Sequence, residues 1–472
     1  MNYPCPTPHA PRPPRVARVI IALVLLFGAM GLKWVDTNYP WLAAYLVEQL
    51  KPPTAEAVAG PTHILFAMTD HFEPHDQATM DRWTAAYRAT ALRHRDADGI
   101  MPQHTWFWYF EVGPVESLSY LQQLAHLAYD GFGEVELHLH HDRDTELTMR
   151  QRTEHMIQLS QQTGAMITAE PTPRTRFGFI HGMWALDNSR AGQFCGVNNE
   201  LRVLRSLGCY ADFTHPSWGR MHPRTINQLY YVTDDPRRPK SYDRGSRMRA
   251  GGQAQGDLLI FEGPSIVRWK GLKPIYDHGN VAADDLPTAD RIADWIATGV
   301  HVQGRPEWVF VKVFAHGAEA EDHEAVAGAW RNRLHTELEQ RYNDGVRYVL
   351  HYVTAREAYN IAKAAEAGHS GNPNDYRNFL IAPYANRLLV ASVPYALQSF
   401  DGRQLRVRLL GTPGTRVDVR VHAGNVSVSG DVAEVEQEAS DGRSIIRLTI
   451  TGEGLVTFTM QPTALAASNR FA

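Results

Sequence analysis

Short apolar runs alternate with amphipathic stretches over most of this chain. Runs with a β-like pattern occur at residues 63–68, 105–110, 135–140, 176–180, 210–213, 258–261, 309–314 and 346–352. The pieces between them carry apolar residues at helical spacing, as at residues 80–95, 115–129, 148–162, 200–207, 288–298 and 325–342. Some runs, such as residues 308–311, are apolar throughout, as strands covered on both faces are. The pattern predicts a parallel α/β architecture, most simply an irregular (β/α) barrel over residues 61–367.

The pattern changes after a last predicted helix at residues 354–367 and a polar linker at residues 368–375. Period-2 alternation, broken by Gly and Asp-Gly turns, then predicts strands at residues 405–410, 416–422, 426–428, 445–451 and 456–460. This predicts a small all-β sandwich domain over residues 376–472, packed behind the barrel. We expect it to have a structural or accessory role, with sugar binding as the alternative.

The first 60 residues form a tail, an apolar segment and a linker. Three arginines precede or interrupt an apolar run at residues 16–32. The run is short for a membrane span, but tilt can accommodate it, and positive charge before it favours a cytoplasmic amino end. It predicts a single-pass helix in the inner or plasma membrane with the rest of the chain exported. A cleaved signal peptide is the alternative.

Composition narrows the classes of function. The net charge is −4 and the chain has no basic stripe, which excludes nucleic acid as an expected partner. Aromatic residues make up 10% of the chain, with eleven tryptophans, and suit a cleft that stacks on ring-shaped ligands such as carbohydrate. Cys195 and Cys209 flank a predicted helix that would hold them too far apart for a disulfide, so we expect two free buried thiols.

The most informative stretch runs from Glu134 to Asp142, with the sequence EVELHLHHD. Side chains two apart share one face of a strand, so His138 and His140 point the same way and Asp142 follows within reach. Two imidazoles and a carboxylate at a strand end form a first shell suited to zinc or another divalent metal.

Polar residues recur at the ends of the predicted strands. The first strand ends in Asp70, His71 and Glu73, the fourth in His181, the fifth in His215 and the seventh in His316. Chemistry in a parallel barrel gathers at the carboxyl ends of its strands. The recurrence of histidine there predicts a metal-assisted hydrolase.

Three motifs give the chain a family resemblance. The sequences MTDHF at residues 68–72, EVELH at residues 134–138 and KVFAHG at residues 312–317 resemble motifs of the polysaccharide deacetylases, the NodB-homology superfamily of carbohydrate esterase family 4. The resemblance implies that Asp70 is the general base and His316 the general acid. It also implies a metal site made of His71, His138 and Asp142.

The chain departs from the family pattern in every motif, and a second ligand scheme remains open. In that scheme Asp70, His138 and His140 bind the metal and Glu73 serves as the base. The family's arginine motif, which orients the base, is replaced by HGMWALDN at residues 181–188.

The resemblance implies removal of acetyl groups from an extracellular or cell-envelope polysaccharide, with zinc as the expected divalent cofactor. Polysaccharide-export machinery is a further expected partner. Rival readings are a carbohydrate-binding pseudoenzyme, a membrane-anchored scaffold, and a glycoside hydrolase that uses two carboxylates. Candidates for those carboxylates are Glu73, Asp187, Asp212 and Glu262.

Overall fold

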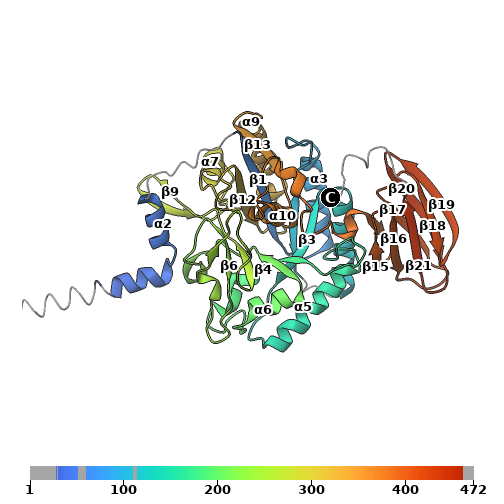
Figure 1. Cartoon of the computed structure of the whole chain (residues 1–472), viewed down its shortest axis with the longest axis horizontal. Helices are drawn as coiled ribbons and strands as arrows, with labels where there is room; N and C mark the ends of the chain where they lie inside the picture. The colour runs from blue at the N-terminus through green and yellow to red at the C-terminus, as the bar shows by residue number, and fades with distance from the viewer. Residues whose placement is uncertain (1–27, 29, 51–59, 110–113, 461–472) are drawn as a thin grey trace, which may run out of the picture.

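The computed structural model describes residues 28, 30–50, 60–109 and 114–460. A large mixed sheet with surrounding helices occupies the middle of the molecule, and two smaller sheets gather at one end (Figure 1). Helix α2 (Leu42–Leu50) lies at the opposite end.

The large sheet has eleven strands in the order β11-β12-β1-β2-β3-β4-β5-β8-β6-β7, with β13 also paired to β1. Their bounds are β1 Thr62–Phe72, β2 His104–Trp108, β3 Gly133–Leu139, β4 Phe177–His181, β5 Cys209–Asp212, β6 Leu229–Val232, β7 Ser246–Arg247, β8 Leu258–Phe261, β11 Asn280–Val281, β12 Trp308–Ala315 and β13 Tyr348–Tyr352. The pairings from β1 through β5 to β8 are parallel, as are those of β1 with β12 and β13. The carboxyl ends of these strands therefore meet at one edge of the sheet.

The predicted (β/α) barrel is wrong. In a closed barrel β8 would pair with β12, but β8 pairs with β6 in antiparallel orientation, and β12 pairs with β11. The short strand β6 occupies the edge of β8 to which β12 would have to pair in a closed barrel. The sheet is open and mixed within the described part of the chain, although the eight predicted runs all correspond to strands in it.

Helices cover both faces of this sheet. They are α3 Gln77–Ala91, α4 Pro114–Tyr129, α5 Glu146–Gln161, α6 Glu200–Leu207, α7 Ala289–Ala297, α8 His323–Val326, α9 Ala329–Arg341 and α10 Ala355–Glu366. Side-chain caps fix several starts: Asp76 accepts from the Thr79 N–H at α3, and Thr354 forms a capping box with Glu357 at α10. A hairpin of β9 (Ile266–Lys270) and β10 (Lys273–Asp277) precedes β11.

Strand β1 shows how the sheet is buried on both faces. Leu65 and Ala67 enter one hydrophobic cluster, whereas Phe66 and Met68 enter another. Alternate residues of a strand face opposite sides, so His71 continues the Leu65 face and Asp70 lies on the other. This alternation decides which polar residues can meet at the end of β1.

The predicted membrane anchor is not supported. No helix of the described residues is long and apolar enough to cross a membrane. Residues 16–27 and 29 of the predicted segment lie outside the described residues, as do Cys5 and most of the predicted linker at 51–61. Cys195 and Cys209 are both buried and free, which confirms the prediction for these two thiols.

The carboxyl-terminal region forms two four-stranded antiparallel sheets, ordered β14-β17-β20-β19 and β15-β16-β21-β18. Their strands are β14 Leu389–Ala391, β15 Tyr395–Phe400, β16 Gln404–Leu409, β17 Arg416–Val421, β18 Val426–Gly430, β19 Val432–Ser440, β20 Arg443–Ile450 and β21 Leu455–Met460. Both sheets contribute to one hydrophobic cluster, for example through Val407 and Val419. Tyr384, just before these strands, donates to Glu136 of β3 at 2.9 Å, so the two regions are joined in their interiors.

Candidate metal centres

Four strand-end side chains converge at one point. His71 lies near the end of β1, with Glu73 just beyond it. His138 lies near the end of β3, with His140 just beyond it. The ring centroids of His71 and His138 are 4.7 Å apart, and those of His138 and His140 are also 4.7 Å apart. Ligand atoms of His71, Glu73 and His138 all lie within 4.8 Å of one another, so these three could hold a metal ion. His140 Nε2 adjoins them, 3.0 Å from Nε2 of His138, and the four residues are called the open centre below.

Glu73 sits between the two imidazoles of β3. Its Oε1 atom lies 2.8 Å from Nε2 of His138 and 3.2 Å from Nε2 of His140, and the two nitrogens are 3.0 Å apart. Ligand bonds of about 2.0–2.2 Å would place neighbouring donors of one ion about 3–3.5 Å apart. The three observed distances, 2.8, 3.0 and 3.2 Å, are at or slightly below this spacing, so the donor set fits a divalent cation.

The imidazoles are also held in a form that can bind a cation. Nδ1 of His138 donates to the Ile180 carbonyl at 2.9 Å, so Nε2 is the nitrogen that faces the centre and would bind an ion. Burial, reinforced by the neighbouring His316 and His138, holds the pKa of His71 well below its ordinary value, so His71 is neutral. Burial raises the pKa of Glu73, but hydrogen bonds with His138 and His140 outweigh it and keep Glu73 ionised.

The open centre is partly accessible. The side chains of Glu73 and His140 are 23% and 27% exposed, whereas His138 is fully buried. A site that keeps an open face leaves a coordination position for substrate or water, as catalytic metal sites do. A Cβ atom at Gly182 would overlap the His140 ring, so this glycine provides the room that His140 occupies.

His316 stands beside the open centre, whereas Asp70 does not face it. His316 is the first residue after β12, and its ring centroid lies 4.5 Å from that of His71. Asp70 is fully buried on the other face of β1, where its Oδ2 accepts from His104 at 2.9 Å and its Oδ1 accepts from the Gly317 N–H at 2.7 Å. The structure therefore brings His316 to the predicted site but gives Asp70 neither base nor ligand geometry.

Asp142 also lies apart from the open centre. The turn after β3 carries it outward, where its side chain is 52% exposed. Its Oδ1 accepts from the Phe194 N–H at 2.5 Å. Asp142 therefore ties down a loop, and Glu73 occupies the carboxylate position expected of it.

A cavity of about 480 Å³ adjoins His316. Trp184, Trp218 and Phe314 form aromatic walls, and Asp284, Glu321 and Asp322 form an acidic rim. Trp184 and Trp218 have ring centroids 4.2 Å apart, and Trp218 is 47% exposed. Such a site suits a ring-shaped polar ligand, because aromatic faces stack on the ring and carboxylates bind its donors.

Two further groups of described residues could hold a metal ion. One comprises His141, His181, Cys195 and Glu200, and all four are buried. The other comprises Asp96, Asp98 and His351. In the latter His351 Nδ1 is 2.7 Å from Asp98 and Arg377 is 3.4 Å from Asp96, so its charges are already matched within the protein.

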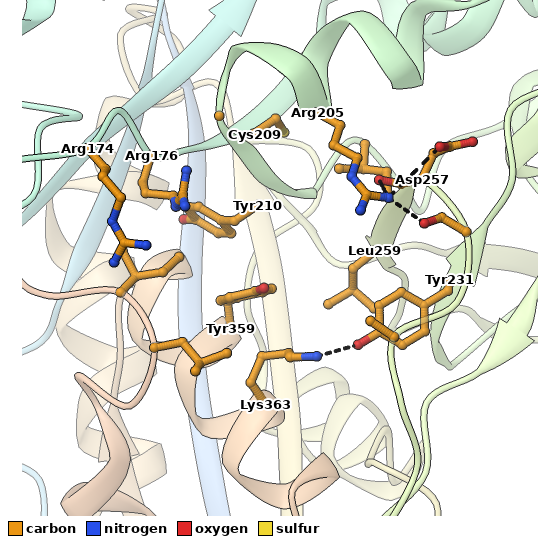
Figure 2. A pocket seen from close by; sticks show the side chains of 16 residues that line it. Arg174, Arg176, Arg205, Cys209, Tyr210, Tyr231, Asp257, Leu259, Tyr359 and Lys363 are labelled. Atoms are coloured by element: carbon orange, nitrogen blue, oxygen red, sulfur yellow. Dashed lines mark hydrogen bonds and ion pairs between the residues drawn. The ribbon is translucent and has the colours of Figure 1, made fainter.

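A separate cavity of about 440 Å³ lies at the opposite, amino ends of β4, β5 and β8. Figure 2 shows Arg174, Arg205 and Lys363 around it. These cations already have partners, because Arg174 pairs with Glu170, Lys363 donates to Tyr231 and Arg205 donates to the Asp257 carbonyl. Its polar lining is therefore mostly satisfied, and the chemistry of the molecule concentrates at the carboxyl ends of the strands.

Comparison with protein-family models, with curated proteins and with solved structures finds no match for this chain. Sequence reasoning singled out His71, Glu73, His138, His140 and His316, which the structure brings together. It did not include Cys195 and Glu200 as candidate ligands, because only the folding of the loop between them brings them to His141 and His181.

Proposed function

We propose that this chain is a metal-dependent hydrolase that removes acetyl groups from a polysaccharide. The observation that carries the proposal is the meeting of an open cation site, the His316 imidazole and an aromatic cavity at one edge of the sheet. Metal ligands, a proton-transfer group and a place for substrate are the parts that such a hydrolase needs.

His71, Glu73, His138 and His140 would hold the cation. When bound, a divalent ion supplies Lewis-acid chemistry, which polarises a carbonyl and strengthens water as a nucleophile near neutral pH. Zinc is the ion that best suits this mixture of imidazole and carboxylate ligands, although other divalent ions use it too.

His316 would move the proton. Because Asp70 faces the other side of β1, His316 is the imidazole that faces both the open centre and the cavity. It would accept a proton from the attacking water and return it to the departing sugar oxygen or nitrogen. The roles first assigned to Asp70 and His316 would thus be combined in one residue.

Trp184 and Trp218 would hold the sugar. Trp184 lines the cavity, and its ring centroid lies 4.2 Å from that of Trp218. The exposed face of Trp218 offers a stacking surface beside it.

The carboxylates predicted for a glycoside hydrolase do not meet at this cavity. That chemistry needs two carboxyl groups flanking the substrate. Asp187, Asp212 and Glu262 are fully buried, and none of them lines the cavity beside His316. Each accepts hydrogen bonds within the protein, from Ser241, Thr214 and Ser265 respectively.

The decisive experiment measures acetate release from acetylated hexosamine polymers by the zinc-loaded full chain. His316→Ala should slow release by about 10²–10⁴-fold while metal content is retained. His75→Ala is the matched control, because His75 is an exposed histidine that does not line the cavity, and its rate should equal that of the unaltered chain. Binding of the polymer without acetate release would instead establish a carbohydrate-binding protein.

A further inference from the structure

Behind the open centre lies a second group of potential ligands, called the closed centre below. His141 follows β3, His181 ends β4, Cys195 lies in the loop after it, and Glu200 opens α6. His141 is 6% exposed and the other three are fully buried. None of the four has a role in the proposed hydrolysis.

Their donor atoms face one another. Glu200 Oε1 is 3.3 Å from Nε2 of His141 and 3.4 Å from Nε2 of His181. Glu200 Oε2 lies 3.4 Å from the Cys195 sulfur. All four donors lie within 4.8 Å of one another, which is close to the spacing of ligands around one tetrahedral ion.

The two histidines are oriented as metal ligands are. Nδ1 of His181 donates to the Gly182 carbonyl at 2.6 Å, so its Nε2 carries the lone pair. That Nε2 atom is fully buried and has no hydrogen-bond partner among the described residues. His141 places Nδ1 3.2 Å from the Asp144 carboxylate, which is the outer-sphere arrangement that orients ligating histidines.

The charge of this group also calls for a cation. Two carboxylates lie against His141, because Asp144 is 3.2 Å from its Nδ1 and the fully buried Glu200 is 3.3 Å from its Nε2. Two neutral imidazoles, one thiolate and one carboxylate would neutralise a divalent ion there, and buried charge is tolerated only when it is compensated.

We propose that His141, His181, Cys195 and Glu200 form a closed, structural site for a divalent cation of the zinc class, separate from the open centre. Binding would release the Cys195 proton to solvent and leave no position for substrate, since all four ligands come from the protein. The proposal holds whether or not the open centre is catalytic.

The closed centre would fix the loop that carries Trp184. This loop joins His181 to Cys195, so the ion would clamp both of its ends. Within it Met183, Trp184, Asp187 and Asn188 all have φ near +50°, a conformation that non-glycine residues hold only when the surroundings impose it. Loss of the closed centre should therefore loosen the cavity wall that Trp184 forms.

Cobalt substitution tests the proposal. The metal-free full chain is loaded with Co²⁺, and its absorption spectrum is recorded. Cys195 is the proposed thiolate ligand, so we expect a near-ultraviolet sulfur-to-cobalt band and strong visible bands typical of a tetrahedral site. Elemental analysis of the zinc-loaded chain should give two ions per chain.

Three variants separate the two centres. Cys195→Ala should lose the sulfur-to-cobalt band and one ion, whereas Cys209→Ala, which removes the other buried thiol, should keep both. His138→Ala should lose one ion but keep the band, so failure of the hydrolase proposal leaves this result intact. If Cys195→Ala fails to fold, the spectrum of the unaltered chain decides alone. Absence of the band with both centres loaded and Cys195 reduced would overturn the proposal.

Discussion

Asp70 accepts a hydrogen bond from the backbone N–H of Gly317 at 2.7 Å, and this bond ties the end of β1 to the residue after His316. Gly317 has no room for a side chain, because a Cβ atom there would overlap the Asp70 carboxylate. We therefore expect Asp70 to act as a positioning residue for His316, without facing the cavity itself. Its carboxylate also accepts from His104.

We predict that Asp70→Asn slows acetate release by less than about tenfold, whereas loss of a true general base typically costs about 10²–10⁴-fold. An asparagine oxygen can still accept from Gly317, so the position of His316 is kept. Asp70→Ala should be much slower, with KM unchanged and full metal content. Steady-state kinetics and elemental analysis of both variants provide the check; equal, severe losses in the two would restore Asp70 as the base.

Metal binding should distinguish His138 from Asp142. We predict that His138→Ala loses the ion of the open centre, because His138 supplies a buried, correctly oriented Nε2 atom. Asp142→Ala should retain it, because Asp142 is exposed and bonds to Phe194. The measurement is metal content after dialysis. An ion lost from the Asp142 variant would favour the ligand set that the family resemblance implies.

Trp218 should act on substrate affinity rather than on the chemical step. We predict that Trp218→Ala raises KM for an acetylated oligosaccharide about threefold to tenfold with kcat nearly unchanged, as loss of an aromatic contact does. Trp269→Ala is the control, because Trp269 is 68% exposed and lies on β9 away from the cavity. If both variants behave alike, Trp218 does not contact the sugar.

A buried ion pair lies next to the cavity in the chain, because Asp277 directly precedes His278, which lines it. Arg291 reaches Asp277 with two bonds, at 2.7 and 2.9 Å. Burial raises the pKa of Asp277, but the pairing with Arg291 outweighs it and holds the pKa below its ordinary value of 3.8. The pair therefore contributes stability above pH 3.8, and that stability is lost as the pH falls through the lower, folded-state pKa.

We predict that Asp277→Asn lowers the free energy of unfolding by about 1–3 kcal/mol at pH 7, because it replaces the charged acceptor of two Arg291 hydrogen bonds, while Asp285, 3.0 Å from Arg291, remains as a partner. The difference from the unaltered chain should shrink as the pH falls below 3.8. Urea unfolding at several pH values measures it. Asp290→Asn, at an exposed position on α7, should change stability by no more than about 0.5 kcal/mol at any of them.

Individual strands and helices could be predicted from the sequence where burial imposes a clear period. The predicted run at residues 309–314 lies within β12. The predicted helix at residues 200–207 corresponds to α6, which has the same bounds. Strand β19 was not predicted, because most of its residues are exposed and polar and carry no alternation. The sequence could not show that the sheet stays open. That outcome depends on the pairing of β6 with β8 across a long intervening segment.

The candidate site, too, has parts that the sequence predicts and parts that it does not. His71 and His138 could be placed together, because both lie near the carboxyl ends of buried strands that share one edge. Asp142 could not be excluded, because the outward turn after β3 has no clear signal in the sequence. The grouping of Cys195 with His141 depends on how a long loop folds back, and local pattern does not determine that.

The hydrogen bond from Tyr384 to Glu136 bears on where this chain can be divided. Glu136 lies on β3, two residues before His138, and Tyr384 lies beyond the polar linker at residues 368–375. A shortened protein that ended at this linker would leave a fully buried carboxylate without one of its donors and would expose the side of the large sheet that now packs internally. The linker therefore marks no natural point for truncation, and we expect the two regions to be inherited, produced and degraded as one unit.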